Sequence, residues 1–176
     1  MRCRIALALI VFGLGGCATQ PESGKHLFVN IKYVGARDEL SKVKALETTT
    51  RSEYVLGTEG AATMDLSTAT VCDKEKARCR SGVLSTELKY KIDTFDGQTV
   101  TISGKIISVT SRNVTTVSFR PSLRTTQRMG LAEGAEFIGE SREERPFTGR
   151  MDLGQSLDLE GVLGAKMTLW FEEKRS

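Results

Sequence analysis

Four cysteines carry most of the reactive chemistry that this sequence offers, because a thiol can bind a metal, exchange electrons or form a disulfide. Cys72 and Cys79 flank a strongly charged segment, 73–78, and a hairpin turning through it would bring the two sulfurs together. A metal site would need further ligands, and the single histidine, His26, is far away in sequence. A redox pair is typical of Cys-x-x-Cys spacing, which this pair does not have. The pattern therefore favours a structural disulfide over a metal or redox site.

Cys17 stands in a different setting. Arg2 and Arg4 precede an apolar run that ends at Leu14 and is too short to cross a bilayer as a helix. Two glycines follow, and then the cysteine. This order resembles the lipobox of bacterial lipoproteins. The resemblance implies a lipoprotein signal peptide over 1–16 and a lipid on the sulfur of Cys17. A plain secretion signal followed by a chance cysteine is the alternative.

The residue after the cysteine bears on the choice of membrane. In the lipoprotein family an aspartate there commonly retains the protein at the inner membrane of Gram-negative cells, and this chain has Ala18 instead. The resemblance therefore implies an outer-membrane anchor. Each buried acyl methylene contributes ~0.8 kcal/mol, so several chains hold a protein without a membrane helix. Residues 17–25 then form the lipidated cysteine and a flexible, polar tether, and 26–176 form one domain that faces the periplasm.

The net charge argues against nucleic acid as a partner. The formal charge of +3 includes Arg2 and Arg4, and their loss with the leader would leave +1. A nearly neutral domain has no electrostatic footprint for phosphate backbones. Cys3 would also leave with the leader, so Cys72 and Cys79 would remain as an even pair in an oxidising compartment.

Alternating apolar and polar residues predict a mainly β chain. In 26–34, Leu27, Val29, Ile31 and Tyr33 alternate with other residues, as in a strand with one buried face. Many short strands separated by turns favour a single antiparallel β-sandwich or barrel-like domain. The further strands are expected at 53–56, 83–95, 98–108, 113–119, 156–159 and 165–172, with a hairpin turn at Asp96-Gly97.

Two local interruptions qualify this pattern. Residues 37–47 are the one plausible helix, with Asp38 as its cap and Leu40, Val43 and Leu46 in a rough stripe, although an irregular strand is also compatible. Gly104 interrupts the apolar face of its strand, which indicates either a bulge or a close packing approach.

Residues 120–149 are less regular than the rest. Arg120, Arg124 and Arg128 come before a run of glutamates, and glycines punctuate the stretch. We expect a long excursion with one broken hairpin centred near 131–134. It is either a flap that faces a partner or a solvated hairpin whose opposite charges pair at less than ~1 kcal/mol each.

Trp170 is the single tryptophan. Leu169 and Phe171 would face the other way from it in a strand, so Trp170 is a candidate contact residue on an outer face. Burial in the core, or at its rim, is the interpretation that the sequence favours.

No residue cluster indicates a catalytic activity, a metal site or a cofactor. Ser41 and Lys44 match the Ser-x-x-Lys motif of serine enzymes that act on penicillin and peptidoglycan, but the Lys-Thr-Gly segment that those enzymes also need is missing. Residues 144–161 resemble the late strand-turn-strand of outer-membrane secretins, in which a Gly-Gln step, here Gly154-Gln155, precedes an apolar strand and a glycine. No functional residue is carried over from either family.

These observations predict a lipid-anchored protein that works by contact. The first hypothesis is a non-enzymatic accessory or assembly component of an envelope complex for secretion, pilus formation or export, with a protein partner. The second is a binding module, similar to lipoproteins that inhibit lysozymes or bind small ligands. An envelope hydrolase is the least favoured class.

Overall fold

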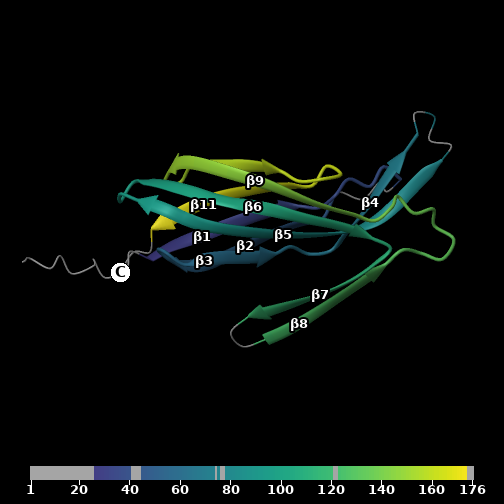
Figure 1. Ribbon diagram of the computed structural model, residues 1–176, viewed down its shortest axis with the longest axis horizontal. Coiled ribbons are helices and arrows are strands. Elements are labelled where there is room, and N and C mark those ends of the chain that lie inside the picture. Colours follow the sequence, from purple (N-terminus) through teal and green to yellow (C-terminus); the bar gives the residue numbers. More distant parts are fainter. Residues whose placement is uncertain (1–25, 41–44, 74, 76–77, 121–122, 174–176) are drawn as a thin grey trace, which may run out of the picture.

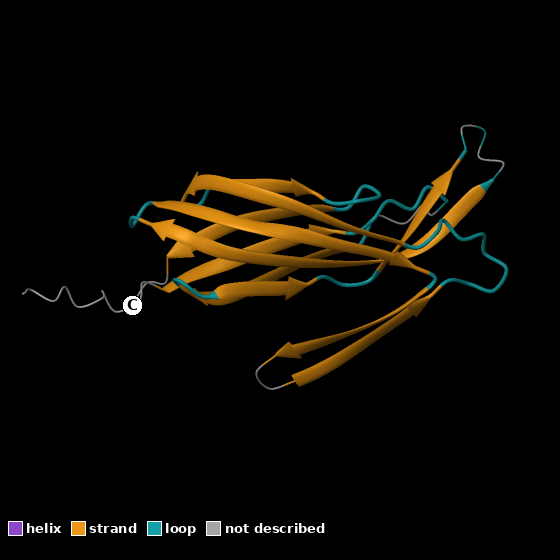
Figure 2. Cartoon of the chain, viewed as in Figure 1, coloured by secondary structure: helices purple, strands orange, loops and turns teal. Residues whose placement is uncertain are grey.

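The computed structural model describes residues 26–40, 45–73, 75, 78–120 and 123–173 (Figure 1). In these residues the chain forms strands joined by loops and no helix (Figure 2), which confirms the mainly β, sandwich-like fold. Accordingly, this part of the chain contains no helix that is long and apolar enough to cross a membrane. In chain order the strands are β1 (His26–Val34), β2 (Glu47–Val55), β3 (Glu59–Thr63), β4 (Ser67–Cys72), β5 (Cys79–Phe95), β6 (Thr99–Ser111), β7 (Asn113–Arg120), β8 (Leu123–Gly130), β9 (Ser141–Asp152), β10 (Ser156–Glu160) and β11 (Lys166–Glu173).

Two antiparallel sheets form the body. Sheet A has the strand order β10-β11-β1-β2, and sheet B has the order β3-β5-β6-β9. The 17-residue strand β5 pairs with β4 along its first part and with β3 further on, while β6 runs along its other edge. Strands β7 and β8 pair only with each other and form a separate hairpin beside the body (Figure 1).

The core lies between the two sheets and follows from the alternation in the sequence. Successive side chains of a strand point to opposite faces. Leu27, Val29, Ile31 and Tyr33 of β1 are at most 1% exposed, as the pattern in 26–34 predicts. One cluster of buried side chains joins both sheets, and its members from sheet B include Leu84, Leu88, Tyr90, Ile92, Val100, Ile102 and Ile106.

The turn between β5 and β6 falls at the Asp96-Gly97 pair, as predicted. Gly97 has a φ of 103°, a conformation that favours glycine. One carboxylate oxygen of Asp96 accepts the backbone N–H groups of Thr99 and Gln98 at 2.7 and 2.9 Å. These hydrogen bonds favour the ionised carboxylate and hold the pKa of Asp96 below its usual value. The turn is thus fixed by one glycine and one acceptor.

Gly104 marks a close packing approach, one of the two alternatives that the sequence left open. A Cβ atom on Gly104 would lie 2.3 Å from the carbonyl oxygen of Lys89 and 2.8 Å from the ring of Phe147. The bulge in this pair of strands is elsewhere, where the register shifts between Ile92 and Thr94.

The helix expected over 37–47 is wrong for the described residues of that segment. Residues 37–40 form bends and an isolated bridge, and Glu47 already starts β2. The N–H of Thr70 donates to the carbonyl of Arg37, and the N–H of Glu39 donates to the carbonyl of Thr70. The backbone therefore hydrogen-bonds to the edge of β4 instead of to its own next turn.

The hairpin expected near 131–134 is also misplaced. The hairpin in this region is β7–β8, which pairs from Asn113 opposite Gly130 to Arg120 opposite Leu123. Residues 131–140 are a loop. This loop hydrogen-bonds to β5 at Ser81, because Ser81 precedes the part of β5 that pairs with β6. The backbone N–H of Ser81 donates to the carbonyl of Glu136, and its backbone carbonyl accepts the N–H of Ile138.

Tyr54 joins the two sheets at one end of the sandwich. Its hydroxyl accepts the buried backbone N–H of Ile92 at 3.0 Å, next to the bulge of β5, and donates to the carbonyl of Thr58. Its ring lies 5.6 Å from that of Tyr90, centroid to centroid. Burial raises the pKa of Tyr90, whose hydroxyl also meets Ser52 of β2. One phenol of β2 thus bridges Ile92 and Thr58 just beyond Glu59 and Lys91, where the pairing of β3 with β5 ends.

Replacing Tyr54 by phenylalanine should lower the free energy of unfolding by about 1–3 kcal/mol, because the Ile92 N–H would stay buried without an acceptor. Urea unfolding measures the change. Tyr33→Phe is the matched control, since the Tyr33 hydroxyl makes only one long contact, 3.5 Å to Thr86 Oγ1. We expect the control to cost less than about 1 kcal/mol. Equal losses for the two variants would contradict this role of Tyr54.

Candidate functional site

The structure describes some of the predicted site residues and not others. Cys17 lies outside the described residues, as do Ser41 and Lys44. Cys72 and Cys79 form a disulfide, with their sulfurs 2.02 Å apart. They face each other in the β4–β5 hairpin, which projects from the sandwich at the end far from the last residue of β11 (Figure 1). The disulfide prediction is therefore confirmed.

The projecting hairpin is tied to the body near its base. Residues around Asp38 bridge the outer edge of β4 at Thr70, and those around Phe137 bridge the free edge of β5 at Ser81. The carboxylate of Glu39 accepts the N–H of Cys72 at 2.9 Å. The disulfide thus closes a hairpin whose base is already paired on both edges.

Replacing both Cys72 and Cys79 by serine should lower the free energy of unfolding by about 2.5 kcal/mol, the loop-closure entropy expected for so short a loop. Urea unfolding with and without a reductant measures it. The reductant should destabilise the natural chain by a similar amount and leave the double variant unchanged. An equal response of both proteins would contradict the assignment.

The predicted contact arginines lie on the β7–β8 hairpin. Arg128 is exposed, and Arg120 and Arg124 occupy strand positions near the turn. The hairpin contacts the body midway along β8, where Gln127, opposite Thr116 in the register, donates to the carboxylate of Asp65 at 2.7 Å. Trp170, the fourth predicted contact residue, belongs to sheet A. The structure therefore divides the predicted contact residues between two surfaces.

Trp170 lies on the outer face of sheet A. Met167, Leu169 and Phe171 of the same strand are at most 1% exposed in the core, while Trp170 is half-buried on the opposite side. In the register, Trp170 is opposite Asn30 of β1, and Asn30 is opposite Arg51 of β2. Three adjacent strands thus present a tryptophan, an asparagine and an arginine in one row.

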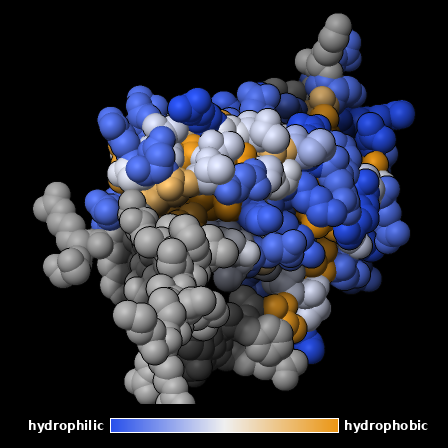
Figure 3. All heavy atoms as spheres, turned by 60° about the vertical axis from the view of Figure 1, so that its left-hand side comes forward, coloured by the Kyte–Doolittle hydropathy of each residue, from blue (hydrophilic) through white to orange (hydrophobic). Residues whose placement is uncertain are grey.

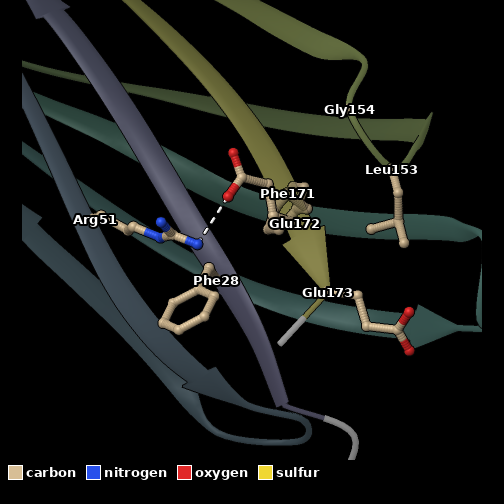
Figure 4. A pocket seen from close by; sticks show the side chains of 7 residues that line it. All are labelled: Phe28, Arg51, Leu153, Gly154, Phe171, Glu172 and Glu173. Atoms are coloured by element: carbon tan, nitrogen blue, oxygen red, sulfur yellow. Dashed lines mark ion pairs between the residues drawn. The ribbon is translucent and has the colours of Figure 1, made fainter. Parts of the chain in front are cut away.

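Glu172 connects the two ends of this row. Its carboxylate accepts the indole N–H of Trp170 at 3.2 Å and forms an ion pair with Arg51 at 2.8 Å. The guanidinium carbon of Arg51 lies 4.0 Å from the centroid of the Phe28 ring. Figure 4 shows Arg51, Phe28 and Glu172 converging from three strands. We call Phe28, Asn30, Arg51, Trp170 and Glu172 the Trp170 cluster.

Asn30 is the unusual member of the cluster. It is 4% exposed although it faces outward. Its side-chain Nδ2 is buried and has no hydrogen-bond partner among the described residues. A buried polar group without a partner costs about 1–3 kcal/mol and is uncommon in native proteins. The cluster therefore holds an unused hydrogen-bond donor beneath its surface.

An open groove of about 620 Å³ adjoins the cluster. Phe28, Arg51 and Glu172 form one wall, and Leu153 and Gly154 of the β9–β10 turn lie opposite (Figure 4). The groove extends the cluster toward the edge of the sheet and gives it the concave shape that ligand sites have.

The sequence pointed to Trp170 but not to the rest of the cluster. Phe28 and Asn30 fall on the outward positions of β1, and a phenylalanine on a polar face was the available signal. Placing Arg51 beside Asn30 requires the register of β1 with β2, and no local pattern in the sequence determines that register.

Other surfaces are less distinctive. On the face in Figure 3, hydrophilic side chains predominate and hydrophobic ones appear in small, separate patches. The exposed large hydrophobic residues, Leu40, Leu46, Val55 and Val71, are scattered over different elements. In the residues that the structure describes, no three His, Cys, Asp or Glu side chains are grouped so that they could hold a metal ion.

Comparison with protein-family models, with curated proteins and with solved structures gives no match to this chain. What the protein does must therefore be argued from its own residues.

Proposed function

We propose that this protein is an outer-membrane-anchored lipoprotein that serves as a non-enzymatic accessory of an envelope assembly, such as a secretion, pilus or export complex. The lipid on Cys17 would fix its place, and the β7–β8 hairpin would contact a protein partner. The observation that carries the proposal is the arginine-bearing β7–β8 hairpin, which among the described residues forms a sheet of its own beside the body.

Both ends of the described chain lie at the same end of the sandwich. Leu27, near the start of β1, is paired with Glu173, the last residue of β11 (Figure 1). The proposed anchor at Cys17 is only a short tether away from β1. The disulfide hairpin projects at the opposite end, and the 17 residues of β5 span on the order of 55 Å. A chain held by its start would therefore present the disulfide hairpin away from the membrane.

The β7–β8 hairpin is suited to contact with a protein. Four arginines and no acidic residue occur in 112–132, whereas five glutamates follow in 133–144. Such a concentration of one charge steers a partner of opposite charge and fixes its orientation. Both strands of the hairpin also keep one edge without a strand partner, which an extended segment of another protein can join. These features support an acidic protein surface as the partner.

Replacing Cys17 by serine should release the protein from the membrane fraction and remove the acyl chains from its mass, because the sulfur would carry the lipid. Membrane fractionation and intact-mass spectrometry measure both effects. Cys3→Ser is the matched control and should leave location and mass of the mature protein unchanged. A Cys17→Ser protein that stays with the membranes at unaltered mass would refute the anchor.

Reversing two charges on the hairpin should disrupt partner contact. With a photo-cross-linking residue at Thr126, the natural chain should be recovered joined to a larger membrane complex. Arg124→Glu with Arg128→Glu should reduce that product at least tenfold, because the partner's acidic groups would be repelled. Arg80→Glu, at an exposed position on β5, is the control and should not. Recovery of the natural chain only as a single species would count against the proposal.

The Trp170 cluster favours a second candidate function, that of a binding module. A sheet face that only meets water does not require the features found here. They are an outward tryptophan, an ion pair that also accepts its indole N–H, and a buried amide nitrogen with no partner among the described residues. The cluster lies on a different sheet from the hairpin, so the two functions are compatible in one molecule.

A further inference from the structure

We propose that the Trp170 cluster binds a saccharide, as a run of neutral hexopyranose units lying across the outer face of sheet A. This goes beyond contact through the hairpin and does not depend on the lipid anchor. It rests on three properties of the cluster: its aromatic surface, its paired charges and its unused donor.

The aromatic surface suits the apolar side of a sugar ring. Trp170 is half-buried in the middle of β11, and Phe28 lies on the neighbouring strand β1, also on the outer face. Ligand sites are mainly apolar and aromatic, with a few polar groups that set orientation. The C–H groups of a pyranose pack on an indole face and do not need the indole N–H. Trp170 uses its own N–H toward Glu172 and is held in place by it.

The polar groups of the cluster match hydroxyls. A sugar hydroxyl both donates and accepts, and the cluster offers a guanidinium that donates and a carboxylate that accepts, 2.8 Å apart. The side chains of Arg51 and Glu172 are 53% and 44% exposed, so both can be reached from solvent. Asn30 lies between Trp170 and Arg51 in the register, and its Nδ2 has no hydrogen-bond partner among the residues that the structure describes. A hydroxyl that enters between those two side chains would accept its hydrogen bond.

The charges of the face argue for a neutral ligand. Arg51 is paired with Glu172, and in the neighbouring rows Lys32 is paired with Glu47 at 2.9 Å. A site for phosphate or carboxylate would present unpaired cations. Arg51 and Lys32 each already have a carboxylate, so an anion at either position would displace it. A neutral, hydroxyl-rich ligand meets no such penalty.

The single tryptophan of the chain makes the test direct, since all tryptophan fluorescence and the one indole N–H resonance come from this site. The full-length protein would be purified in a detergent without a sugar headgroup and titrated with two probes. One is the β-1,4-linked tetramer of N-acetylglucosamine, which stands for an N-acetylated glycan. The other is cellotetraose, which stands for an unacetylated one. We expect saturable changes in the fluorescence and the indole resonance with at least one probe, at a Kd of about 1 mM or tighter.

Two substitutions in the Trp170 cluster test whether the saccharide binds there. Arg51→Ala should weaken it about tenfold, because one charged hydrogen-bond donor is lost. Trp170→Phe, followed by calorimetry in place of fluorescence, should also weaken it. Arg80→Ala, at an exposed position on β5, should leave the Kd unchanged. Because Arg51 is exposed, its truncation is not expected to prevent folding, and the urea midpoint checks this.

Two outcomes would overturn the proposal. The first is a folded protein whose Trp170 signals do not change with either probe up to about 10 mM, roughly ten times the expected Kd. The second is binding that Arg51→Ala and Trp170→Phe leave unaffected, since the sugar would then lie elsewhere. Binding should persist in the Cys17→Ser protein, so failure of the anchor and failure of the saccharide site are separate results.

Discussion

The structure depends on the burial of one apolar face from each of two sheets against the other. Each strand contributes every second side chain, so the same alternation that fills the core also turns a second row outward. On β1 and β11 the inward row is at most 1% exposed, from Leu27 to Phe171. The outward row is therefore held in register by the core beneath it. Tyr54 strengthens the arrangement, because its hydroxyl satisfies a backbone N–H of sheet B just beyond the point where the pairing of β3 with β5 ends.

Local patterns in the sequence predicted correctly those features whose interacting residues are close in the chain. The strand 26–34, the turn at Asp96-Gly97 and the disulfide of Cys72 with Cys79 need only alternation, one turn signal and a short loop. The failures arise from long-range pairing. Residues 37–40 bond to Thr70 of β4 instead of forming a helix, and the loop after the β7–β8 hairpin is set by Ser81 of β5. No window of the sequence contains both partners of such a bridge.

The candidate site shows the same division. The sequence favoured burial of Trp170 in the core or at its rim and left an outer face as the other possibility, because its neighbours face inward. The structure has Trp170 half-buried on the outer face. Its surroundings come from three strands that are distant in the chain: Asn30 and Phe28 from β1 and Arg51 from β2. The hairpin arginines, in contrast, are close in sequence and needed only the correct turn. The arginine surface of the hairpin thus follows from local composition, whereas the Trp170 cluster follows from the register of three strands.

Taken together, the proposals describe a rod-like sandwich held at one end, with a saccharide face on its side and hairpins for protein contact. The most direct test is the distance of each end from the bilayer. Fluorescent labels at Gln98, an exposed residue of the β5–β6 turn, and at Glu75, in the disulfide hairpin, would be compared by energy transfer to a dye in the membrane surface. The proposed anchoring predicts efficient transfer from Gln98 and little from Glu75, which lies on the order of 50 Å farther out. Equal transfer from both labels, or stronger transfer from Glu75, would contradict it.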